Sequence, residues 1–408
     1  MRRVSTVRSR VRPPWRHSRN QVSEKAGTVQ SGRRGVVCLL IGTSTLISAA
    51  QQAMGQEPIS AGWHHACALS EEGAAFCWGA NTNGQLGDGG TTDRSQPTKV
   101  NTGEVFTTIT AGASHTCAVT TGGEAYCWGD NSEGQVGIGV AAGQLERPAP
   151  IRGNVLYQIV RAGVNHTCGV SRSGDAYCWG GNRDGELGDG TTISRAEPTK
   201  VVADVHFRDI AVGSAHTCGL TSNGAVYCWG GNWSGQLGDG TTESRSRPRR
   251  ILVTQPFTYV GSGGESTCAL TAEGQAFCWG RDAASDGSFS NLTAPMQVAR
   301  GIALTDIGVG RTHICSVAGD GVAYCWGDNN YGGVGINGVR VHEPFTQVAT
   351  DVLFQRVRAG FGFTCGMSVA GRVYCWGDNS RGQLGVGDNY DVRDTWRPTA
   401  VKGAALGM

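Results

Sequence analysis

The most regular feature of the sequence is a segment whose side chains alternate between the two faces of an expected strand pair. In the copy at residues 111–129, AGASHTCAVTTGGEAYCWG, Cys117 and Cys127 share one face, whereas Tyr126 and Trp128 point to the other. Alternation with a period of two is typical of β-strands. The segment therefore predicts an antiparallel hairpin with one face of aromatic side chains and one of cysteines.

This segment occurs seven times at a nearly constant interval. Its second cysteine falls at Cys77, Cys127, Cys178, Cys228, Cys278, Cys325 and Cys375, so that successive copies are 47 to 51 residues apart. That interval suits one propeller blade of four short strands. Glycine makes up 64 of the 408 residues, which fits many tight turns. We predict an all-β fold, a seven-bladed β-propeller of four-stranded antiparallel blades over residues 56–408, which stacks the aromatic face of each blade on the cysteine face of its neighbour.

The two cysteines of each copy are spaced to face each other across the hairpin. Cys117 and Cys127 centre the hairpin on Gly122, and the next position, Gly123, is glycine in every copy. A three-residue hairpin loop favours a left-handed third residue, which glycine accepts. Directly opposed residues have Cα atoms about 4.5–5.5 Å apart, which permits a disulfide. We expect one intrablade disulfide per blade, at Cys67 and Cys77, Cys117 and Cys127, Cys168 and Cys178, Cys218 and Cys228, Cys268 and Cys278, Cys315 and Cys325, and Cys365 and Cys375.

The cysteine pairs also indicate a compartment. A structural zinc site needs about four clustered ligands, and two cysteines locked across one hairpin supply half of that at most. Fourteen paired cysteines are typical of an oxidising environment. The expected location is secreted, periplasmic or at the cell surface.

Charge is distributed unevenly along the chain. Residues 1–34 hold ten of the 35 Lys and Arg and one of the 33 Asp and Glu, which leaves 25 basic and 32 acidic residues in the remainder. A mildly acidic body is a poor footprint for nucleic acid, so no nucleic-acid partner is expected.

The first 55 residues have the order of a secretory signal. A basic segment precedes the mostly apolar stretch from Val36 to Ala50, and the small residues Ala53 and Gly55 follow. A signal anchor that stays in the bilayer is an alternative, and is the only membrane contact expected. An organelle transit peptide is another, which the cysteines argue against.

The repeat resembles that of the regulator of chromosome condensation family. The shared pattern is AG, HTCAL, a hairpin glycine, YCWG, an asparagine and GQLG, as at Asn232 and Gly235–Gly238, and it covers residues 57–402. The resemblance implies a seven-bladed propeller, and the cysteine pair in every blade suggests an extracellular branch. Founding members of the family are nuclear exchange factors for a small GTPase and bind chromatin, whereas another relative is a secreted bacterial inhibitor that grips an enzyme with one ring face.

Candidate catalytic or metal-binding chemistry is sparse. Five copies carry a histidine two residues before the first cysteine: His65, His115, His166, His216 and His313. We interpret them as hydrogen-bonded core histidines and not as a metal or proton-relay ring. Asp88, Asp189 and Asp239 in GDG turns, and Asp388 with Asp391, fit turn chemistry better than a calcium site. The sequence carries no familiar catalytic motif, so we assign no catalytic, cofactor or metal-binding residue.

Departures from the repeat indicate where a partner binds. Exposed aromatic residues near arginine are typical interface anchors. The hypothesis is that one ring face near blades four to seven binds a protein or glycan outside the cytoplasm, with a monomeric chain acting as a non-catalytic scaffold. The candidate residues are Trp233, Arg281, Phe289, Tyr331, Tyr390 and Trp396. A nucleotide-exchange or chromatin-type regulator and a secreted enzyme with a site at the channel mouth stay open as alternatives, as does closure of the last blade by the segment from Pro58 to Gly62.

Overall fold

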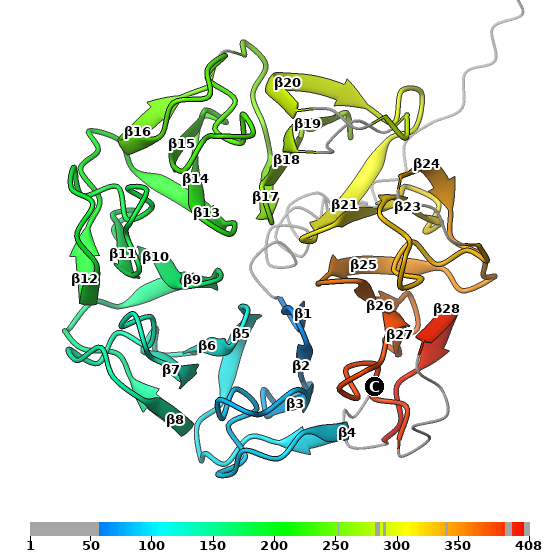
Figure 1. Ribbon diagram of the computed structural model, residues 1–408, viewed down its shortest axis with the longest axis horizontal. Coiled ribbons are helices and arrows are strands. Elements are labelled where there is room, and N and C mark those ends of the chain that lie inside the picture. The colour runs from blue at the N-terminus through cyan, green and yellow to red at the C-terminus, as the bar shows by residue number, and fades with distance from the viewer. Residues whose placement is uncertain are drawn as a thin grey trace, which may run out of the picture. The chain divides into compact units, whose positions relative to one another are not determined.

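The described residues form seven four-stranded sheets arranged around a central axis (Figure 1). The structure is a computed structural model, and it describes residues 57–251, 253–281, 286–288, 291–338, 342–387 and 394–403. The proposed leader lies outside these residues. Among the residues described, no helix has the length and hydropathy of a membrane span. The predicted seven-bladed all-β propeller is confirmed.

The strands follow one another along the chain, four to a blade. Blades 1 to 3 contain β1 (Ile59–Ala61), β2 (His65–Leu69), β3 (Ala75–Gly79), β4 (Arg94–Lys99), β5 (Phe106–Ala111), β6 (His115–Thr120), β7 (Ala125–Asp130), β8 (Gln144–Pro150), β9 (Tyr157–Ala162), β10 (His166–Ser171), β11 (Ala176–Gly180) and β12 (Arg195–Lys200). Blades 4 and 5 contain β13 (Phe207–Val212), β14 (His216–Thr221), β15 (Val226–Gly230), β16 (Arg245–Arg250), β17 (Tyr259–Gly263), β18 (Ser266–Leu270), β19 (Ala276–Arg281) and β20 (Asn291–Val298). Blades 6 and 7 contain β21 (Leu304–Val309), β22 (His313–Ala318), β23 (Ala323–Gly327), β24 (Glu343–Gln347), β25 (Phe354–Ala359), β26 (Phe363–Ser368), β27 (Val373–Asp378) and β28 (Asp394–Ala400).

Each sheet is an antiparallel meander of consecutive strands. The first strand of a blade lies nearest the axis and the fourth lies outermost, as β1 to β4 show (Figure 1). The question of ring closure is thereby answered, because the segment that includes β1 forms the inner strand of its own blade and does not complete blade 7. Blades 1 and 7 instead meet as whole sheets, where Trp78 Nε1 donates a hydrogen bond to the Gln383 carbonyl at 2.9 Å.

The central hairpin of each blade has the predicted register. Cys117 lies opposite Cys127, and the loop between the strands ends at Gly123, whose φ is 92°. Because Thr120 N donates to the Glu124 carbonyl, alternation places the cysteines at a pair without backbone hydrogen bonds, where strands approach most closely.

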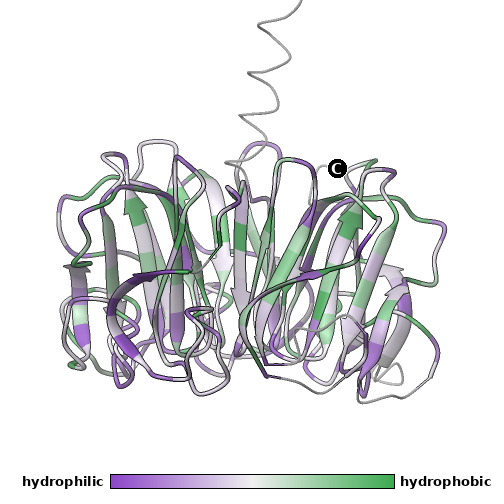
Figure 2. Ribbon diagram, turned by 90° about the horizontal axis from the view of Figure 1, so that it is seen from above, coloured by the Kyte–Doolittle hydropathy of each residue, from purple (hydrophilic) through white to green (hydrophobic). Residues whose placement is uncertain are grey.

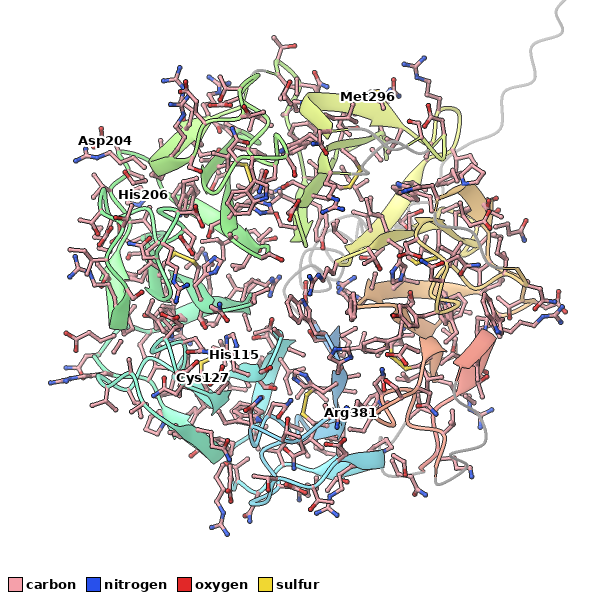
Figure 3. All side chains as sticks on the ribbon, viewed as in Figure 1. His115, Cys127, Asp204, His206, Met296 and Arg381 are labelled. Carbon is pink, nitrogen blue, oxygen red and sulfur yellow. A yellow bond between two sulfur atoms is a disulfide. The ribbon has the colours of Figure 1, made fainter. Side chains whose placement is uncertain are left out.

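All seven predicted disulfides are present, one in each blade (Figure 3). Their Cα atoms are 4.1 Å apart in every case, somewhat closer than the 4.5–5.5 Å expected from the sequence. The sulfurs lie within the apolar layer between blades.

Neighbouring blades pack aromatic face against cysteine face, as predicted. Trp128 of blade 2 lies in one buried cluster with Cys67 and Cys77 of blade 1, and Trp179 of blade 3 lies with Cys117 and Cys127 of blade 2. The seven repeated tryptophans are fully buried. Each contributes about 5 kcal/mol of hydrophobic stabilisation as an upper estimate.

The ring has two faces, which carry different connections between the strands. In a four-stranded meander the first and third connections lie at one end of the sheet, and the second connection and the link to the next blade lie at the other. The end with the first and third connections, such as residues 112–114 and 131–143, is called the loop face here, and the opposite end, with hairpin turns such as residues 121–123, is called the turn face. Figure 2 shows the strands standing between these two faces.

Candidate functional site

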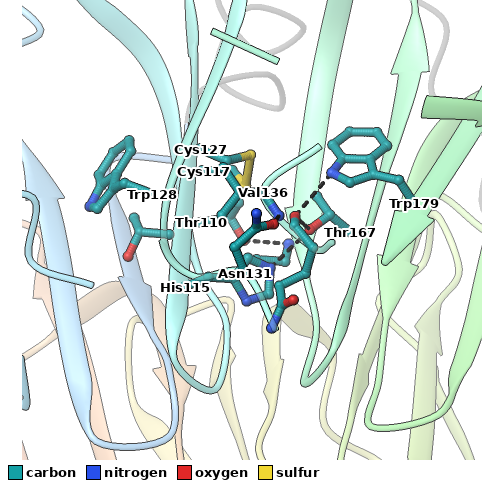
Figure 4. The surroundings of a disulfide bond; sticks show 12 residues. Thr110, His115, Cys117, Cys127, Trp128, Asn131, Val136, Thr167 and Trp179 are labelled. Atoms are coloured by element: carbon teal, nitrogen blue, oxygen red, sulfur yellow. Dashed lines mark hydrogen bonds between the residues drawn. A yellow bond between two sulfur atoms is a disulfide. The ribbon is translucent and has the colours of Figure 1, made fainter. Parts of the chain in front are cut away.

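The five histidines of the repeat lie between blades in a shared hydrogen-bond arrangement. His115 Nε2 is 2.9 Å from Thr167 Oγ1 of the next blade, and Thr167 Oγ1 donates to the Gln135 carbonyl at 2.8 Å (Figure 4). Trp179 Nε1 donates to the same carbonyl at 3.0 Å. The other four histidines contact the corresponding threonine at 2.7 to 3.0 Å, in the pairs His65 with Thr116, His166 with Thr217, His216 with Thr267, and His313 with Thr364.

This arrangement determines the tautomer of the histidines. Since the single hydroxyl proton of Thr167 is donated to Gln135, His115 Nε2 must carry the proton that it shares with Thr167. His115 Nδ1 is then a bare acceptor, and it is buried with no partner in the described structure. Burial lowers the pKa of His115 and His313 to about 4 and that of the other three to about 3. The histidines are therefore neutral at neutral pH, and their expected role as core residues is confirmed, although the partner is a threonine hydroxyl and not a backbone group.

Two of the seven junctions lack this pair, and both partners are replaced together. Between blades 5 and 6 the positions of histidine and threonine are occupied by Ser266 and Ile314, and between blades 7 and 1 by Phe363 and Ala66. At the first of these junctions the buried Trp326 Nε1 also finds no acceptor among the described residues, because blade 5 lacks the GQLG segment. The sequence shows this paired replacement, because the threonine of each pair directly follows the histidine position of the next copy.

The acidic GDG residues serve as turn anchors. The Asp88 carboxylate accepts hydrogen bonds from Asn81 and Gly90 N, and Arg94 lies 2.7 Å away. Asp189 and Asp239 have equivalent arginines at 3.1 and 3.2 Å, which confirms the turn interpretation. Asp388 and Asp391 lie outside the described residues. Within the described ranges, no group of three or more His, Cys, Asp or Glu could hold a metal ion.

At the turn face the channel carries a network of charged side chains. Arg161 Nη2 is 2.8 Å from Glu57 Oε1 and 3.6 Å from Asp209 Oδ1. Arg358 lies 3.0 Å from Asp306 and 3.5 Å from Glu57. The network ties the inner strands of blades 3, 4, 6 and 7 to Glu57, two residues before β1.

This network bears on whether the mouth of the channel is an enzyme site. Burial opposes ionisation of Glu57, but the arginines around it outweigh burial and lower its pKa. Burial raises the pKa of Asp209 despite the nearby Arg161. A cavity of about 640 Å³ adjoins these groups and is lined in part by Tyr259, Ile159 and Leu304. Among the described residues, Glu57, Asp209 and Asp306 thus each lie within 3.6 Å of an arginine.

At the loop face the channel mouth is asymmetric. The residue after the glycine of each AG segment is small in blades 2 to 5, where it is Ala113, Val164, Ser214 or Gly264, and large in blades 6, 7 and 1, where it is Arg311, Phe361 or Trp63. The glycine before it permits adjacent blades to touch here, since a Cβ on Gly360 would lie 2.3 Å from the Gly62 carbonyl oxygen. The three large residues come from consecutive blades.

These large residues form a cluster of aromatic rings around one guanidinium. The Arg311 guanidinium carbon lies 4.2 Å from the Trp63 ring centroid and 5.0 Å from that of Phe361. Phe361 also contacts His64, edge to face at 5.3 Å, and Tyr331 at 6.1 Å between centroids. Trp63, Phe361, Arg311, His64 and Tyr331 are called the mouth cluster below.

A cavity of about 380 Å³ lies beside the mouth cluster. Trp63, Arg311 and Phe361 form part of its wall, and polar groups of blades 4 to 6 form much of the rest, including Ser214, Glu265, Arg281, Thr312 and Asp328. Glu265 accepts a hydrogen bond from Ser234 Oγ at 2.7 Å and lies 3.6 Å from Arg281. The cavity therefore combines aromatic, cationic, anionic and hydroxyl groups at the axis of the ring.

The residues proposed from the sequence are distributed unevenly around this site. Arg281 lines the cavity, and Tyr331, 43% exposed, belongs to the mouth cluster. Trp233 is 46% exposed, two residues from the Gly231 against which its ring packs. Trp396 is half-buried, with its indole against Gly332, so it packs against the propeller more than it projects into solvent. Phe289 and Tyr390 lie outside the described residues.

Sequence reasoning missed Trp63, Phe361 and Arg311. All three lie inside the repeated AG to CWG segment, whereas the binding residues predicted from the sequence are departures from the repeat outside that segment. A comparison of the seven copies at this single column shows three large residues in consecutive blades, and that signal was available from the sequence.

Comparisons with known proteins agree with the architecture. A model of the RCC1-like domain matches residues 42–291, and models of the regulator of chromosome condensation (RCC1) repeat match residues 304–332, 354–383 and 370–405. The ultraviolet-B receptor UVR8 of Arabidopsis thaliana is 30% identical over 149 residues, which are 36% of this chain and 34% of the receptor. The chain thus matches about a third of the length of that relative.

Several solved structures share this fold. Prp20p of Saccharomyces cerevisiae is 22% identical, with a TM-score of 0.74 over 83% of this chain and 88% of that one. Human WBSCR16 is 21% identical, with a TM-score of 0.72 over 81% and 95%. The ectodomain of the Arabidopsis thaliana receptor kinase ACR4 is 22% identical, with a TM-score of 0.52 over 79% and 97%. At these identities the similarity shows the fold alone.

Proposed function

This chain belongs to the regulator of chromosome condensation (RCC1) repeat family, and on that premise we propose that it is an exported, monomeric and non-catalytic propeller that binds a protein or glycan through its loop face. The mouth cluster is the observation that carries this proposal. Aromatic and arginine side chains on an exposed surface are the residue types that dominate binding energy at interfaces. Tyr331 and Arg311 are exposed there, on a rigid ring.

Export is supported by the cysteines and by the leader pattern. Seven disulfides are fully buried within the blades, a number typical of proteins that fold in oxidising surroundings. We propose that residues 1–55 direct the chain to that compartment and that cleavage occurs near Gly55. The ectodomain of ACR4, a receptor kinase, has a related fold.

An intracellular regulatory role is the main alternative. Prp20p is described by its binding to Gsp1p and histones, and this role would require a reducing compartment for the present chain. The acidic body of the chain, 32 acidic against 25 basic residues after residue 34, does not favour a chromatin surface. No residue of an exchange site is carried over by position.

A catalytic role has little support from the described channel. The carboxylates at the turn face are paired with Arg161 and Arg358. In a typical enzyme site, neighbouring carboxyls have pKa values moved apart to provide an acid and a base. Here the pKa of Glu57 is lowered and that of Asp209 is raised, but both carboxylates lie against the same arginine, Arg161, at 2.8 and 3.6 Å, which makes them ion-pair partners within the channel.

The proposal is tested in two steps. Intact mass of the protein from its native host, with and without reduction before alkylation, should show loss of the leader and fourteen alkyl groups only after reduction. An uncleaved chain with freely alkylated cysteines would move the intracellular alternative to first place.

The second step locates the binding face. Immobilised protein is incubated with proteins and glycans released from the surface of the source cells, and the retained species are identified by mass spectrometry. The double variant Trp63→Ala and Tyr331→Ala should lose them, whereas Leu156→Ala, a 42% exposed residue ahead of β9 at the turn face, should not. Equal retention by both variants would exclude the loop face.

A further inference from the structure

We propose that the cavity beside the mouth cluster binds a sugar residue that bears a carboxylate, a uronic acid, and that Arg311 receives the carboxylate. This inference rests on the proposed function, because it specifies the ligand class of the loop face.

Arg311 is positioned as a receptor for an anion. Its backbone N donates to the Gly360 carbonyl at 3.1 Å, which places it next to Phe361. Its guanidinium then lies over the Trp63 and Phe361 rings, at 4.2 and 5.0 Å from their centroids. Cation–π contact fixes the plane of the guanidinium without using its N–H donors.

Across the described residues, the N–H donors of the Arg311 side chain have neither a carboxylate partner nor a hydrogen bond to a neighbour. It is an exposed residue that lines the cavity. An oriented guanidinium with free donors matches a planar carboxylate, which it binds through two parallel hydrogen bonds.

The other groups in the cavity require a ligand that also carries hydroxyls. Glu265 and Asp328 present carboxylate oxygens, and Ser214 and Thr312 present hydroxyls. Carboxylates accept hydrogen bonds and repel further negative charge. A ligand with one carboxylate and several hydroxyl donors satisfies both sets of groups, and a uronic acid has that composition.

Size and charge disfavour the other anionic ligands. About 380 Å³ is near the lower end for small-molecule sites, so the cavity takes one compact group and not a broad protein surface. A DNA strand or a peptide segment of Asp and Glu would bring negative charge without hydroxyl donors for Glu265 and Asp328. A free inorganic anion would supply no hydroxyl donor to the remaining acceptor positions of Glu265 and Asp328.

Tyr331 indicates where a sugar chain would extend from the cavity. Its ring is 43% exposed and lies 6.1 Å from Phe361, at the outer edge of the mouth cluster. A sugar linked to the bound uronic acid has an aromatic surface to stack on there. The site is therefore suited to an acidic polysaccharide and not only to a free monosaccharide.

The experiment is a titration of the purified, disulfide-intact protein with a trimer of galacturonic acid. The matched probes are a neutral trimer of galactose and inorganic sulfate, all at the same ionic strength. Binding is measured by calorimetry and by quenching of tryptophan fluorescence. The acidic trimer should bind, and the neutral trimer and sulfate should each bind at least about tenfold more weakly, because each lacks one of the two recognised features.

The variants separate charge from geometry. Arg311→Gln should weaken binding of the acidic trimer about tenfold or more, since a charge-assisted pair is lost. Arg311→Lys should recover only part of it, because an ammonium group lacks the planar fork. Arg300→Gln, an exposed arginine just after β20, is the matched control and should bind as the parent does. Circular dichroism and the denaturation midpoint verify that each variant is folded.

Several outcomes would overturn the inference. They are no binding of the acidic trimer, equal binding of the neutral trimer, sulfate binding as tight as that of the trimer, or an Arg311→Gln variant that binds like the parent. If the acidic trimer fails while the Trp63 and Tyr331 variant still loses captured macromolecules, the sugar assignment is wrong and the proposed function stands. If both fail, the loop face is not the binding surface.

Discussion

His115 and Thr167 should be energetically coupled, so that replacing both should lower the free energy of unfolding by less than the sum of the two single replacements. Both groups are buried, and His115 Nε2 donates to Thr167 Oγ1 over 2.9 Å. The chain itself contains the apolar replacement, because Phe363 and Ala66 occupy these positions between blades 7 and 1. The variants to compare are His115→Phe, Thr167→Ala and the double substitution.

The magnitudes follow from which atoms are left unpaired. Thr167→Ala leaves the His115 N–H buried without an acceptor, which costs about 1–3 kcal/mol, and removes one buried methyl group for roughly 1 kcal/mol more. His115→Phe removes one neutral hydrogen bond, for about 1 kcal/mol, while Thr167 still donates to Gln135. The double variant has no orphaned N–H, so its free energy of unfolding should fall by only about 1–2 kcal/mol. The coupling is then about 2 kcal/mol.

The assay is guanidinium unfolding at pH 7.5 without reductant, followed by tryptophan fluorescence, with equal m-values required before free energies are compared. A control cycle combines His115→Phe with Thr217→Ala at the next junction. Thr217 bonds to His166 and shares no partner with His115, so these effects should add. A coupling below about 0.5 kcal/mol between His115 and Thr167 would refute the reasoning, since the effects of substitutions at independent sites add to within about that value.

Two further predictions concern the layer between blades, and a third concerns the hairpin turn. The interblade histidines, with pKa values of about 3 to 4, stay neutral in the folded chain, whereas an unfolded histidine gains a proton below pH 6.5. The free energy of unfolding should therefore fall as pH drops from 6.5 to 4, by about 1.4 kcal/mol per pH unit for each histidine. Denaturation curves at several pH values test this, and the slope should be shallower for the double variant with His115→Phe and Thr167→Ala. Trp128→Phe should destabilise by about 1–2 kcal/mol more than Trp326→Phe, because Trp128 Nε1 donates to Gln85 at 2.9 Å whereas Trp326 Nε1 has no acceptor in the described structure; equal denaturation midpoints would contradict it. Gly123→Ala forces a side chain onto a residue with φ of 92° and should lower the free energy of unfolding by about 1 kcal/mol or more. Gly319→Ala, in the hairpin loop of blade 6, is the comparison in the same melting experiment, because its φ is not positive and a Cβ there would have no atom within 4 Å.

The sequence predicted the fold in detail because the fold repeats. Cysteine spacing and the hairpin glycine specify the register of one hairpin, and seven copies specify the ring. The link from Trp179 to the Gln135 carbonyl could not be predicted, since a backbone acceptor in the preceding blade leaves no mark in the composition. Closure of the ring was likewise open, because the residues around β1 fit either an inner strand of blade 1 or a strand added to blade 7.

The candidate site was predicted only in part, for a different reason. Arg281, the last residue of β19, and Tyr331, in a loop of blade 6, lie where departures from the repeat are easy to see. Trp63, Phe361 and Arg311 lie in the repeated segment, where a large residue is indistinguishable from packing until adjacent blades are compared at one position. Their grouping depends on blade 1 following blade 7 in space, which is a property of the closed ring and not of the linear order.

The completeness of every sheet has a consequence for synthesis. Because each sheet of the described residues takes its four strands from consecutive positions in the chain, a chain that emerges from its amino end can finish a sheet, and oxidise its cysteine pair, once four strands are available. Local oxidation of cysteines ten residues apart leaves few opportunities for wrong partners, although fourteen cysteines permit a very large number of mispairings. A propeller closed by a shared strand would have to hold one blade unfinished until the final residues appeared. Here the last event is the meeting of two finished surfaces, at which Trp78 reaches the Gln383 carbonyl.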